Sequence, residues 1–403
     1  MDTVRLDTVV RNSHPTQPAL FIDFAGIRDT FRRFEIAFPG AHIDYAMKAN
    51  ANPTVCAQIV ALGGGLEIAS LPELNRALDA GATGERIICS HPIKQPAFLR
   101  RMQEVGVYAA TVDSIDEVEK VAEHAPGMRV YVRLAVDNTG SVLPLAGKFG
   151  VDAATALDLI DRARELGLQP IGVSFHVGSQ CLNVSNWVNA IKAGGEVFRA
   201  AADHGHQLYF LDIGGGFPAG HYHDESIPTI EAIGVAVMAA VDAYVPSVPG
   251  FILALEPGRG LVGESGRLVA NVMGKALRGG NQHWLYLDVG VFNGLMETFE
   301  GFPPVVTLLA DDAEARPQRV YTLAGPSCDS CDVIARDMTL PEIRVGDRLE
   351  FYDTGAYTNE YAAAFNGFPI PEIIMLNLDV NAFHTVAATH HDASDTRAVA
   401  LSA

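Results

Sequence analysis

The chain has 403 residues, 48% hydrophobic and 19% charged, which is enough to bury a sizeable core in one large and one smaller domain. Its formal net charge of −19 argues against nucleic acid as a partner, because a phosphate backbone requires a basic surface. The cysteine count of five is odd and low, four of the five are scattered, and the N-terminus has no apolar signal core, so we expect a cytoplasmic protein with reduced thiols and no disulfide framework.

Short apolar runs alternate with amphipathic segments from about residue 43 to residue 256. We expect strands at 43–47, 66–69, 87–89, 109–112, 128–134, 170–175, 208–212 and 251–255. Helical patterns lie between them, for example at 71–80, 153–165 and 187–204. This alternation predicts right-handed parallel units, and eight such strands can close a (β/α)8 barrel. A doubly wound open sheet is the alternative. The apolar stretch 232–241 is too short to cross a bilayer.

The pattern changes near Gly258, where the apolar runs become strand-like and the turns denser. Strands are expected at 268–272, 284–287, 305–309, 320–323, 348–352 and 372–376. Few helical segments intervene, which predicts a C-terminal antiparallel β-domain. We therefore expect the barrel over residues 21–258, a β-domain formed by 1–20 and 259–380, and a flexible tail over 381–403.

Polar residues follow or end most of the predicted barrel strands. In chain order they are Lys48, Glu67, Arg133, His176, the glycines 214–216 and Glu256. In a closed barrel the carboxyl ends of the strands converge on one mouth, where barrel enzymes keep their active sites. We therefore expect these residues to lie together.

Each of these residues has an ordinary and a chemical interpretation. A lysine after a strand is usually a surface lysine, but Lys48 at a barrel mouth could be partly desolvated, neutral and able to form a Schiff base. Glu256 and Arg259 could form a surface ion pair. Alternatively, Glu256 could face a pyridine nitrogen while Arg259 holds a phosphate.

The glycine run and the histidine motif also have two interpretations. The glycines at 214–216 could form a simple turn or a loop whose backbone N–H groups approach a phosphate. His176 could be a satisfied core residue, or it could stack on a flat aromatic ring with Ser179 bonding the phosphate.

The cysteine pair in Cys328-Asp329-Ser330-Cys331 resembles a redox or zinc motif. Without a second pair or a thioredoxin-like context, we favour a single thiol acting as a proton donor. Two polar clusters, His221/His223/Asp224 and His390/His391/Asp392, resemble metal ligands by composition only. We expect no metal site.

Taken in order, these motifs resemble the fold-type III pyridoxal 5'-phosphate (PLP) enzymes, in the group of ornithine, lysine, arginine and diaminopimelate decarboxylases. The resemblance covers about residues 20–377. Its landmarks lie at 45–50, 67–70 with Glu73, 148–150, 176–179, 214–216, 256–259, 325–330 and 355–358. It implies an alanine-racemase-like barrel and PLP-dependent decarboxylation of an amino acid.

The resemblance also implies roles for particular residues. Lys48 would carry PLP as a Schiff base, Glu256 would pair with the pyridine nitrogen, and His176 would stack on the ring. The phosphate would be held by Ser179, Gly215, Gly216, Arg259 and Tyr357. Glu67 and Arg133 would lie around the cofactor. Cys328 would protonate the product, and with Asp329 it would reach the partner subunit's site in a homodimer.

The substrate is expected to be ornithine or lysine. The family's diaminopimelate enzymes carry Cys-Glu-Ser where this chain has Cys328-Asp329-Ser330, and Asp329 could meet a distal ammonium. Eukaryotic ornithine decarboxylases have an acid where this chain has Val289, so Asp288 or Glu297 would have to replace it, with Tyr357 also near the substrate.

Several alternatives stay open at the level of sequence. A conjugated or related diamino acid such as diaminopimelate or diaminobutyrate could be the substrate, or the enzyme could be an amino-acid racemase. Two non-catalytic alternatives are a PLP-binding homeostasis protein and an inactive regulator. No role is assigned to Cys331.

Overall fold

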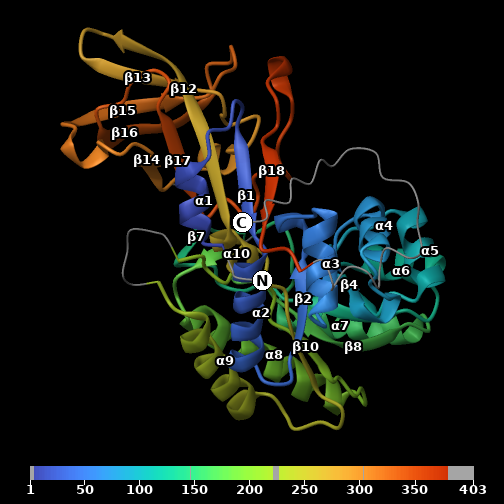
Figure 1. The fold of residues 1–403 in the computed structure, drawn as a ribbon. Coiled ribbons are helices and arrows are strands. Elements are labelled where there is room, and N and C mark those ends of the chain that lie inside the picture. Colours follow the sequence, from blue (N-terminus) through green and yellow to red (C-terminus); the bar gives the residue numbers. More distant parts are fainter. Residues whose placement is uncertain (1–3, 146, 221–226, 303, 380–403) are drawn as a thin grey trace.

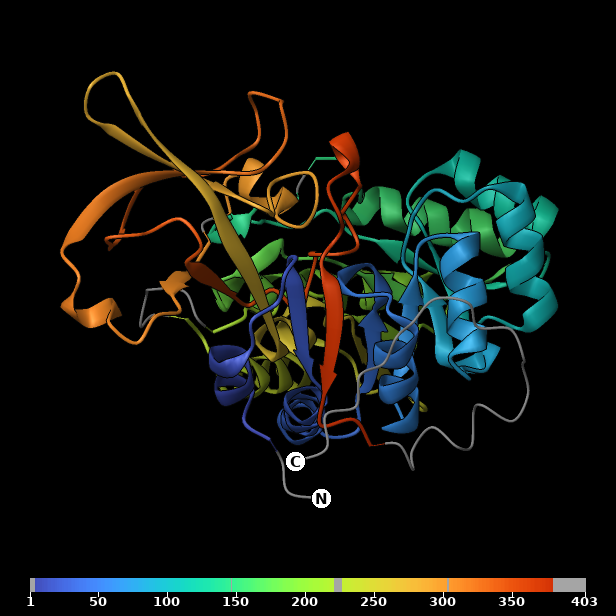
Figure 2. The same cartoon turned by 45° about the horizontal axis from the view of Figure 1, so that its top comes forward.

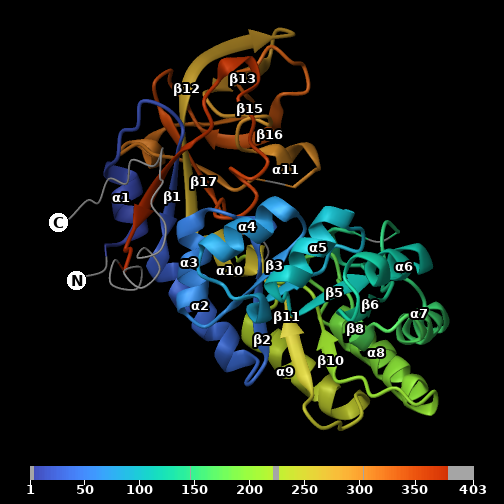
Figure 3. The ribbon, with the colours of Figure 1, turned by 90° about the vertical axis from the view of Figure 1, so that its right-hand side faces the viewer.

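A closed barrel of parallel strands and an eight-stranded sheet make up the computed structural model, which describes residues 4–145, 147–220, 227–302 and 304–379. Figure 1 shows the barrel with its helices, and the sheet beyond it. In Figure 3 the sheet lies above the barrel. Among the described residues, no helix has the length and apolar character needed to cross a membrane.

All eight predicted barrel strands are confirmed, with ends that differ by a few residues at most. They are β2 (His42–Ala46), β3 (Gly65–Ile68), β4 (Ile87–Cys89), β5 (Ala109–Val112), β6 (Arg129–Arg133), β8 (Gln169–Ser174), β10 (Phe210–Asp212) and β11 (Ile252–Leu255). Each pairs in parallel with its neighbours, and β11 pairs with β2 to close the barrel. The open-sheet alternative is therefore wrong.

Helices cover the outside of the barrel. They are α2 (Phe24–Ala37), α3 (Pro53–Ala61), α4 (Leu71–Asp79), α5 (Pro96–Val105), α6 (Ile115–His124), α7 (Ala153–Glu165), α8 (Ser185–Asp203) and α9 (Ile230–Tyr244). Local sequence sets several starts: the side chains of Ser70, Ser114 and Asp152 accept backbone N–H bonds in the first turn of α4, α6 and α7. The barrel interior holds Tyr131, Phe210 and Ala254 in one apolar cluster.

Alternation along the strands makes this interior polar toward the carboxyl ends. Asp212 lies two residues after Phe210 on β10, and Glu256 lies two residues after Ala254 at the end of β11. Because successive side chains of a strand point to opposite faces, each acid shares the inward face of the apolar residue before it. The apolar cluster is thus the floor of a polar mouth.

The second sheet confirms the predicted β-domain, because it is mostly antiparallel and contains two parallel strand pairs. Its strands are β1 (Ala19–Asp23), β12 (Gly266–Arg278), β13 (Gln282–Leu287), β14 (Val306–Leu308), β15 (Gln318–Ala324), β16 (Val333–Pro341), β17 (Arg348–Tyr352) and β18 (Glu372–Leu376). The pairs β1–β18 and β13–β15 are parallel, and the other pairs are antiparallel.

The barrel is inserted between two strands of this sheet. Strand β1 precedes the barrel and pairs with β12, which follows it, and with β18 near the end of the described chain. Figure 2 shows the blue β1 between the golden β12 and the red β18. Residues 19–23 therefore lie in the sheet, although we expected the barrel to begin at residue 21. Residues 381–403 lie outside the described residues.

Candidate active site

Lys48 lies in the 3₁₀ turn Met47–Ala49, directly after β2 at the barrel mouth. Its Nζ is 3.4 Å from Oε2 of Glu67 on β3, and its side chain is 46% exposed. The Glu67 carboxylate raises the pKa of Lys48 above its ordinary value. The buried Glu67 carboxylate beside the amine therefore favours the charged form of Lys48, whereas the sequence suggested a partly neutral amine.

Glu256 follows β11 and is buried at the centre of the mouth. Its Oε1 accepts a hydrogen bond from the Ser90 hydroxyl, and Ser90 Oγ lies 2.7 Å from the hydroxyl of Tyr131. Asp212 at the end of β10 is a second buried acid close enough to interact electrostatically with Glu256. Burial and the Glu67 carboxylate raise the pKa of Glu256. Its neighbours therefore fix the orientation of this acid.

His176 lies two residues after the end of β8, at the barrel mouth. Its Nδ1 accepts the backbone N–H of Gly178 at 3.0 Å, which leaves Nε2 to carry the proton of the neutral ring. Burial, together with the nearby Arg133 and Lys48, lowers the pKa of His176 well below its ordinary value. The ring is therefore a neutral, flat group at neutral pH.

The glycine run after β10 forms a cradle beside these two residues. Gly214 and Gly216 have φ angles of 64° and 93°, in the left-handed region that favours glycine. A Cβ on Gly215 would lie 2.7 Å from the carbonyl oxygen of Glu256 and 3.2 Å from Nε2 of His176. Only a bare backbone fits at this point. Ser179 begins β9 (Ser179–Cys181), which pairs with β7 (Ser141–Leu143).

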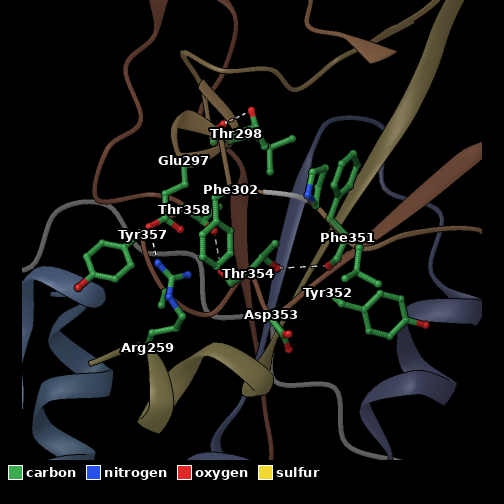
Figure 4. Close-up of a pocket in the computed structure, with 15 residues that line it drawn as sticks. Arg259, Glu297, Thr298, Phe302, Phe351, Tyr352, Asp353, Thr354, Tyr357 and Thr358 are labelled. Atoms are coloured by element: carbon green, nitrogen blue, oxygen red, sulfur yellow. Dashed lines mark hydrogen bonds and ion pairs between the residues drawn. The ribbon is translucent and has the colours of Figure 1, made fainter. Parts of the chain in front are cut away.

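Arg259 begins α10 (Arg259–Val262) and lies buried between two aromatic rings. Its Cζ is 4.3 Å from the ring centre of Phe302 and 4.9 Å from that of Tyr357. The guanidinium also forms an ion pair with Glu297 of α11 (Met296–Phe299). Figure 4 shows Arg259, Glu297, Phe302 and Tyr357 gathered around one pocket.

Hydrogen bonds from the sheet domain hold Tyr357 against the turn that carries Lys48. The backbone N–H of Tyr357 donates to the carbonyl of Ala49 at 2.7 Å. Nearby, the Asn50 side chain donates to the carbonyl of Gly355 at 2.9 Å. The N–H of Ala51 donates to the Glu360 carboxylate at 2.8 Å. The mouth is thus assembled from both domains.

Two acids were expected to replace the one that is missing at position 289, and the structure separates them. Asp288 uses Oδ1 and Oδ2 to accept from the backbone N–H and the side-chain amide of Asn271 on the neighbouring strand, at 2.8 and 2.6 Å. Its carboxylate is therefore engaged by β12. Glu297 lines the pocket and forms an ion pair with Arg259.

Cys328 and Asp329 lie exposed in a loop of the sheet domain. The backbone N–H of Cys328 donates to Asn366, and the Asp329 carboxylate accepts the backbone N–H of Cys331 at 2.9 Å. This bond from Cys331 lowers the pKa of Asp329, which stays ionised. Both residues thus form hydrogen bonds with partners in the sheet domain. Arg133 ends β6 with its Cζ 5.6 Å from the ring centre of Phe149.

Four residues of the barrel interior escaped the sequence prediction: Ser90, Tyr131, Asp212 and Asp44. Ser90 comes directly after β4, which is the same positional signal that identified Lys48. Burial raises the pKa of Asp44 to about 7 and that of Asp212 well above its usual range. Several buried acids therefore share this interior.

No three His, Cys, Asp or Glu side chains of the described residues form a group that could hold a metal ion. The histidine clusters at 221–224 and 390–392 lie outside the described residues. All five cysteines are free, with Cys56, Cys89 and Cys181 buried.

Comparison with known proteins gives consistent matches. Residues 24–263 match the family model described as pyridoxal-dependent decarboxylase, pyridoxal binding domain. The chain is 32% identical over 365 residues to the lysine/ornithine decarboxylase of Selenomonas ruminantium, covering 89% of each chain.

Two solved structures are similar over nearly their whole length. The arginine decarboxylase of Paramecium bursaria Chlorella virus matches with a TM-score of 0.85 and 28% identity, covering 92% of this chain and 99% of that chain. The lysine/ornithine decarboxylase of Vibrio vulnificus, solved with putrescine, matches with a TM-score of 0.80 and 31% identity. The second match covers 92% of this chain and 97% of that one.

Proposed function

The chain belongs to the family of pyridoxal-dependent decarboxylases, and we propose that it converts a basic L-amino acid, ornithine or lysine, to the corresponding amine and CO2. The observation that carries this proposal is the convergence of one amine, one buried carboxyl group and one neutral imidazole at the barrel mouth. These are Lys48, Glu256 and His176.

The residues of the mouth fit PLP. The amine of Lys48 can bond an aldehyde, and the glycine backbone at 214–216, where a Cβ on Gly215 would collide with its neighbours, leaves room for a phosphate. Arg259, which lies beside the ring of Tyr357, supplies a cation. The phosphate would be held by Ser179, Gly215, Gly216, Arg259 and Tyr357. Glu67 and Arg133 would flank the cofactor.

When bound, PLP supplies an electron-poor ring that stabilises the charge left on Cα as CO2 departs. Glu256, oriented by its hydrogen bond from Ser90, would hold a proton at the ring nitrogen. His176, neutral and flat, would pack against the ring and exclude water from it. Cys328 would return a proton to Cα through its thiol.

The distal ammonium group of a basic substrate needs an acidic partner. Position 289, where the sequence analysis noted an acid in eukaryotic ornithine decarboxylases, is a valine in this chain. Glu297 lines the pocket, and Asp329 remains ionised at the surface of the sheet domain. We propose that both serve the basic end of the substrate, together with Tyr357. A related or conjugated diamino acid is the second candidate substrate. It is favoured by the ion pair between Arg259 and Glu297, because this pair engages the carboxylate that would otherwise bind the ammonium group of ornithine.

We also propose a homodimer with shared active sites and a cytoplasmic location. The exposure of Cys328 and Asp329 supports the first, since a proton donor and a substrate ligand on the outer surface of one subunit can act only in a neighbouring mouth. The free state of all five cysteines supports a reducing compartment.

A panel of amino acids tests the substrate. Purified enzyme loaded with PLP is assayed for CO2 release from ornithine, lysine, arginine, diaminobutyrate and diaminopimelate. We expect ornithine or lysine to give the highest kcat/KM. Release from diaminopimelate alone, or interconversion of enantiomers without CO2, would contradict the proposal.

Substitution of Lys48 tests the cofactor link. Lys48→Ala should lose the visible absorbance of bound PLP and all measurable CO2 release, because it removes the amine beside Glu67 that is proposed to bond the aldehyde. Lys48→Arg is the matched control: it keeps the positive charge beside Glu67 and still lacks a nucleophilic amine, so it should be equally colourless. Retained absorbance in either variant would place the link elsewhere.

A further inference from the structure

A chain of buried side chains reaches Glu256 from beneath the mouth. The Tyr131 hydroxyl, on the inner face of β6, lies 2.7 Å from Ser90 Oγ, and the Ser90 hydroxyl donates to Oε1 of Glu256. Tyr131 is fully buried and Ser90 is 8% exposed. The three residues come from β6, from the end of β4 and from the end of β11, so they lie across the barrel interior.

Asp212 reaches the same acid from β10. Its Oδ1 accepts the backbone N–H of Gly214 at 2.8 Å, which fixes its orientation, and burial together with the negative charge of Glu256 raises its pKa well above its usual range. Two buried acids that repel each other in this way favour a state in which one of them is ionised and the other holds a proton.

The hydrogen-bond directions decide which acid carries that proton. Burial keeps the pKa of Tyr131 well above its usual value, so its hydroxyl remains a donor and can donate to Ser90. Ser90 is then free to donate its single hydrogen to Glu256. A donor favours the ionised form of the carboxyl group that accepts it, and the hydrogen bond from Ser90 lowers the pKa of Glu256. Asp212 lies fully buried beside this charge and has the more strongly raised pKa, so it is the acid that holds the proton.

We propose that Ser90, oriented by Tyr131, is a positioning residue that holds Glu256 as the ionised member of the Asp212–Glu256 pair and aims it into the mouth. This rests on the proposed function only in assigning Glu256 to the ring nitrogen of PLP. The other charged or titratable groups that act on Glu256 or on its partner acid are Glu67, Lys48 and Asp44. They remain unchanged in the variants described below.

Two measurements on Ser90→Ala test this role apart from turnover. The first is the dissociation constant of PLP from the cofactor-free protein, and the second is the ¹⁵N chemical shift of ring-labelled PLP, which reports protonation of the ring nitrogen. Loss of a hydrogen bond to a buried charged group should weaken PLP binding about tenfold. The ¹⁵N signal should move toward that of an unprotonated ring.

Ser174→Ala is the matched control. It removes a hydroxyl of the same size from the same barrel interior, where Ser174 Oγ lies 3.5 Å from the hydroxyl of Thr111, and Ser174 is not the residue that donates to Glu256. It should leave both measurements as in the wild type. Wild-type PLP affinity and ¹⁵N shift in Ser90→Ala, or equal changes in Ser174→Ala, would overturn the proposal.

Tyr131→Phe and the double variant test the order of the chain. Tyr131→Phe removes only the hydroxyl that orients Ser90, so its changes should have the same direction and be smaller than those of Ser90→Ala. The double variant should match Ser90→Ala within about twofold, because Tyr131 acts through Ser90. Additive losses in the double variant would contradict the proposal that Tyr131 acts through Ser90. If Ser90→Ala does not fold, the PLP affinity and ¹⁵N shift of Tyr131→Phe test the proposal by themselves.

These outcomes are separable from those of the substrate panel. A wild type that decarboxylates no amino acid, with a shifted ¹⁵N signal in Ser90→Ala, would reject the proposed function and leave this inference standing. A wild type that decarboxylates ornithine or lysine, with PLP affinity and ¹⁵N shift unchanged in Ser90→Ala, would support the proposed function and reject the role of Ser90.

Discussion

Glu297 lines the pocket beside Arg259, the proposed phosphate ligand, and is itself a proposed substrate ligand. Its carboxylate pairs with Arg259, and its side chain is 14% exposed. Burial raises its pKa, while the neighbouring guanidinium opposes that shift and favours the charged form. If Arg259 binds the phosphate of PLP instead of Glu297, the carboxylate of Glu297 becomes available to the ammonium group of a substrate.

Glu297→Gln should therefore raise KM for ornithine or lysine about tenfold, because a charge-assisted hydrogen bond becomes a neutral one. Steady-state kinetics measure this, with PLP at saturation so that any change at Arg259 does not limit the rate. Glu300→Gln, an exposed acid at the end of the same helix, is the control and should keep the wild-type KM. An unchanged KM in Glu297→Gln would remove this residue from the substrate site.

Position along a strand made some site residues predictable and left others hidden. Lys48 and Glu256 each come directly after a barrel strand, so their place at the mouth follows from strand order. The direction of Asp288 depends on the pairing of β12 with β13, with a register shift near Val272, which no local pattern reveals. The Arg259–Glu297 pair likewise joins segments whose contact depends on the tertiary fold.

At the scale of elements, the barrel strands were predictable because each is a buried apolar run bounded by turns. Strand β16 was missed because it is an edge strand with exposed charged residues and a positive φ of 55° at Asp337. The parallel pair β1–β18 was equally hidden, since its partners lie at opposite ends of the chain. Sequence periodicity identifies strands better than it identifies their partners.

Strand β2 carries a buried acid that makes stability depend on pH. Burial raises the pKa of Asp44 from 3.8 to about 7, with Arg86 opposing and Glu256 and Glu67 reinforcing the shift. Below pH 3.8 the group is protonated in both the folded and the unfolded chain. Between these values only the unfolded chain ionises, so its contribution to stability is full at low pH and is lost as pH rises through 7.

Asp44→Asn should remove this pH-dependent loss of stability. The pKa shift of Asp44 corresponds to a loss of about 4 kcal/mol in unfolding free energy. Urea unfolding of the cofactor-free protein at about pH 5 and about pH 8 should show a smaller fall in unfolding free energy for the variant than for the wild type. Asp79→Asn, at the exposed end of α4, changes net charge equally and should keep the wild-type slope. Parallel slopes in all three proteins would show that Asp44 does not titrate between folded and unfolded states.

At the scale of the whole molecule, inserting the barrel into the sheet brings distant segments together. The loop after β17 delivers Tyr357 to the turn of Lys48, although about 300 residues separate them in the chain. A second loop of the same sheet, with Cys328 and Asp329, faces outward instead. One domain thus completes the mouth of its own barrel and also exposes chemical groups that a second subunit can use.

A heterodimer of two inactive variants tests this division directly. One subunit carries Lys48→Ala and the other Cys328→Ala, with different tags so that only mixed dimers are purified. If Cys328 acts in the mouth of the partner subunit, one mouth has both residues intact, and the heterodimer should show about half the wild-type kcat. Each variant alone should be nearly inactive. Cys331→Ala in place of Cys328→Ala is the control, since Cys331 has no proposed role and that variant should be active by itself. A heterodimer as inactive as its parents would mean that each subunit supplies its own proton donor, and the shared site would have to be abandoned.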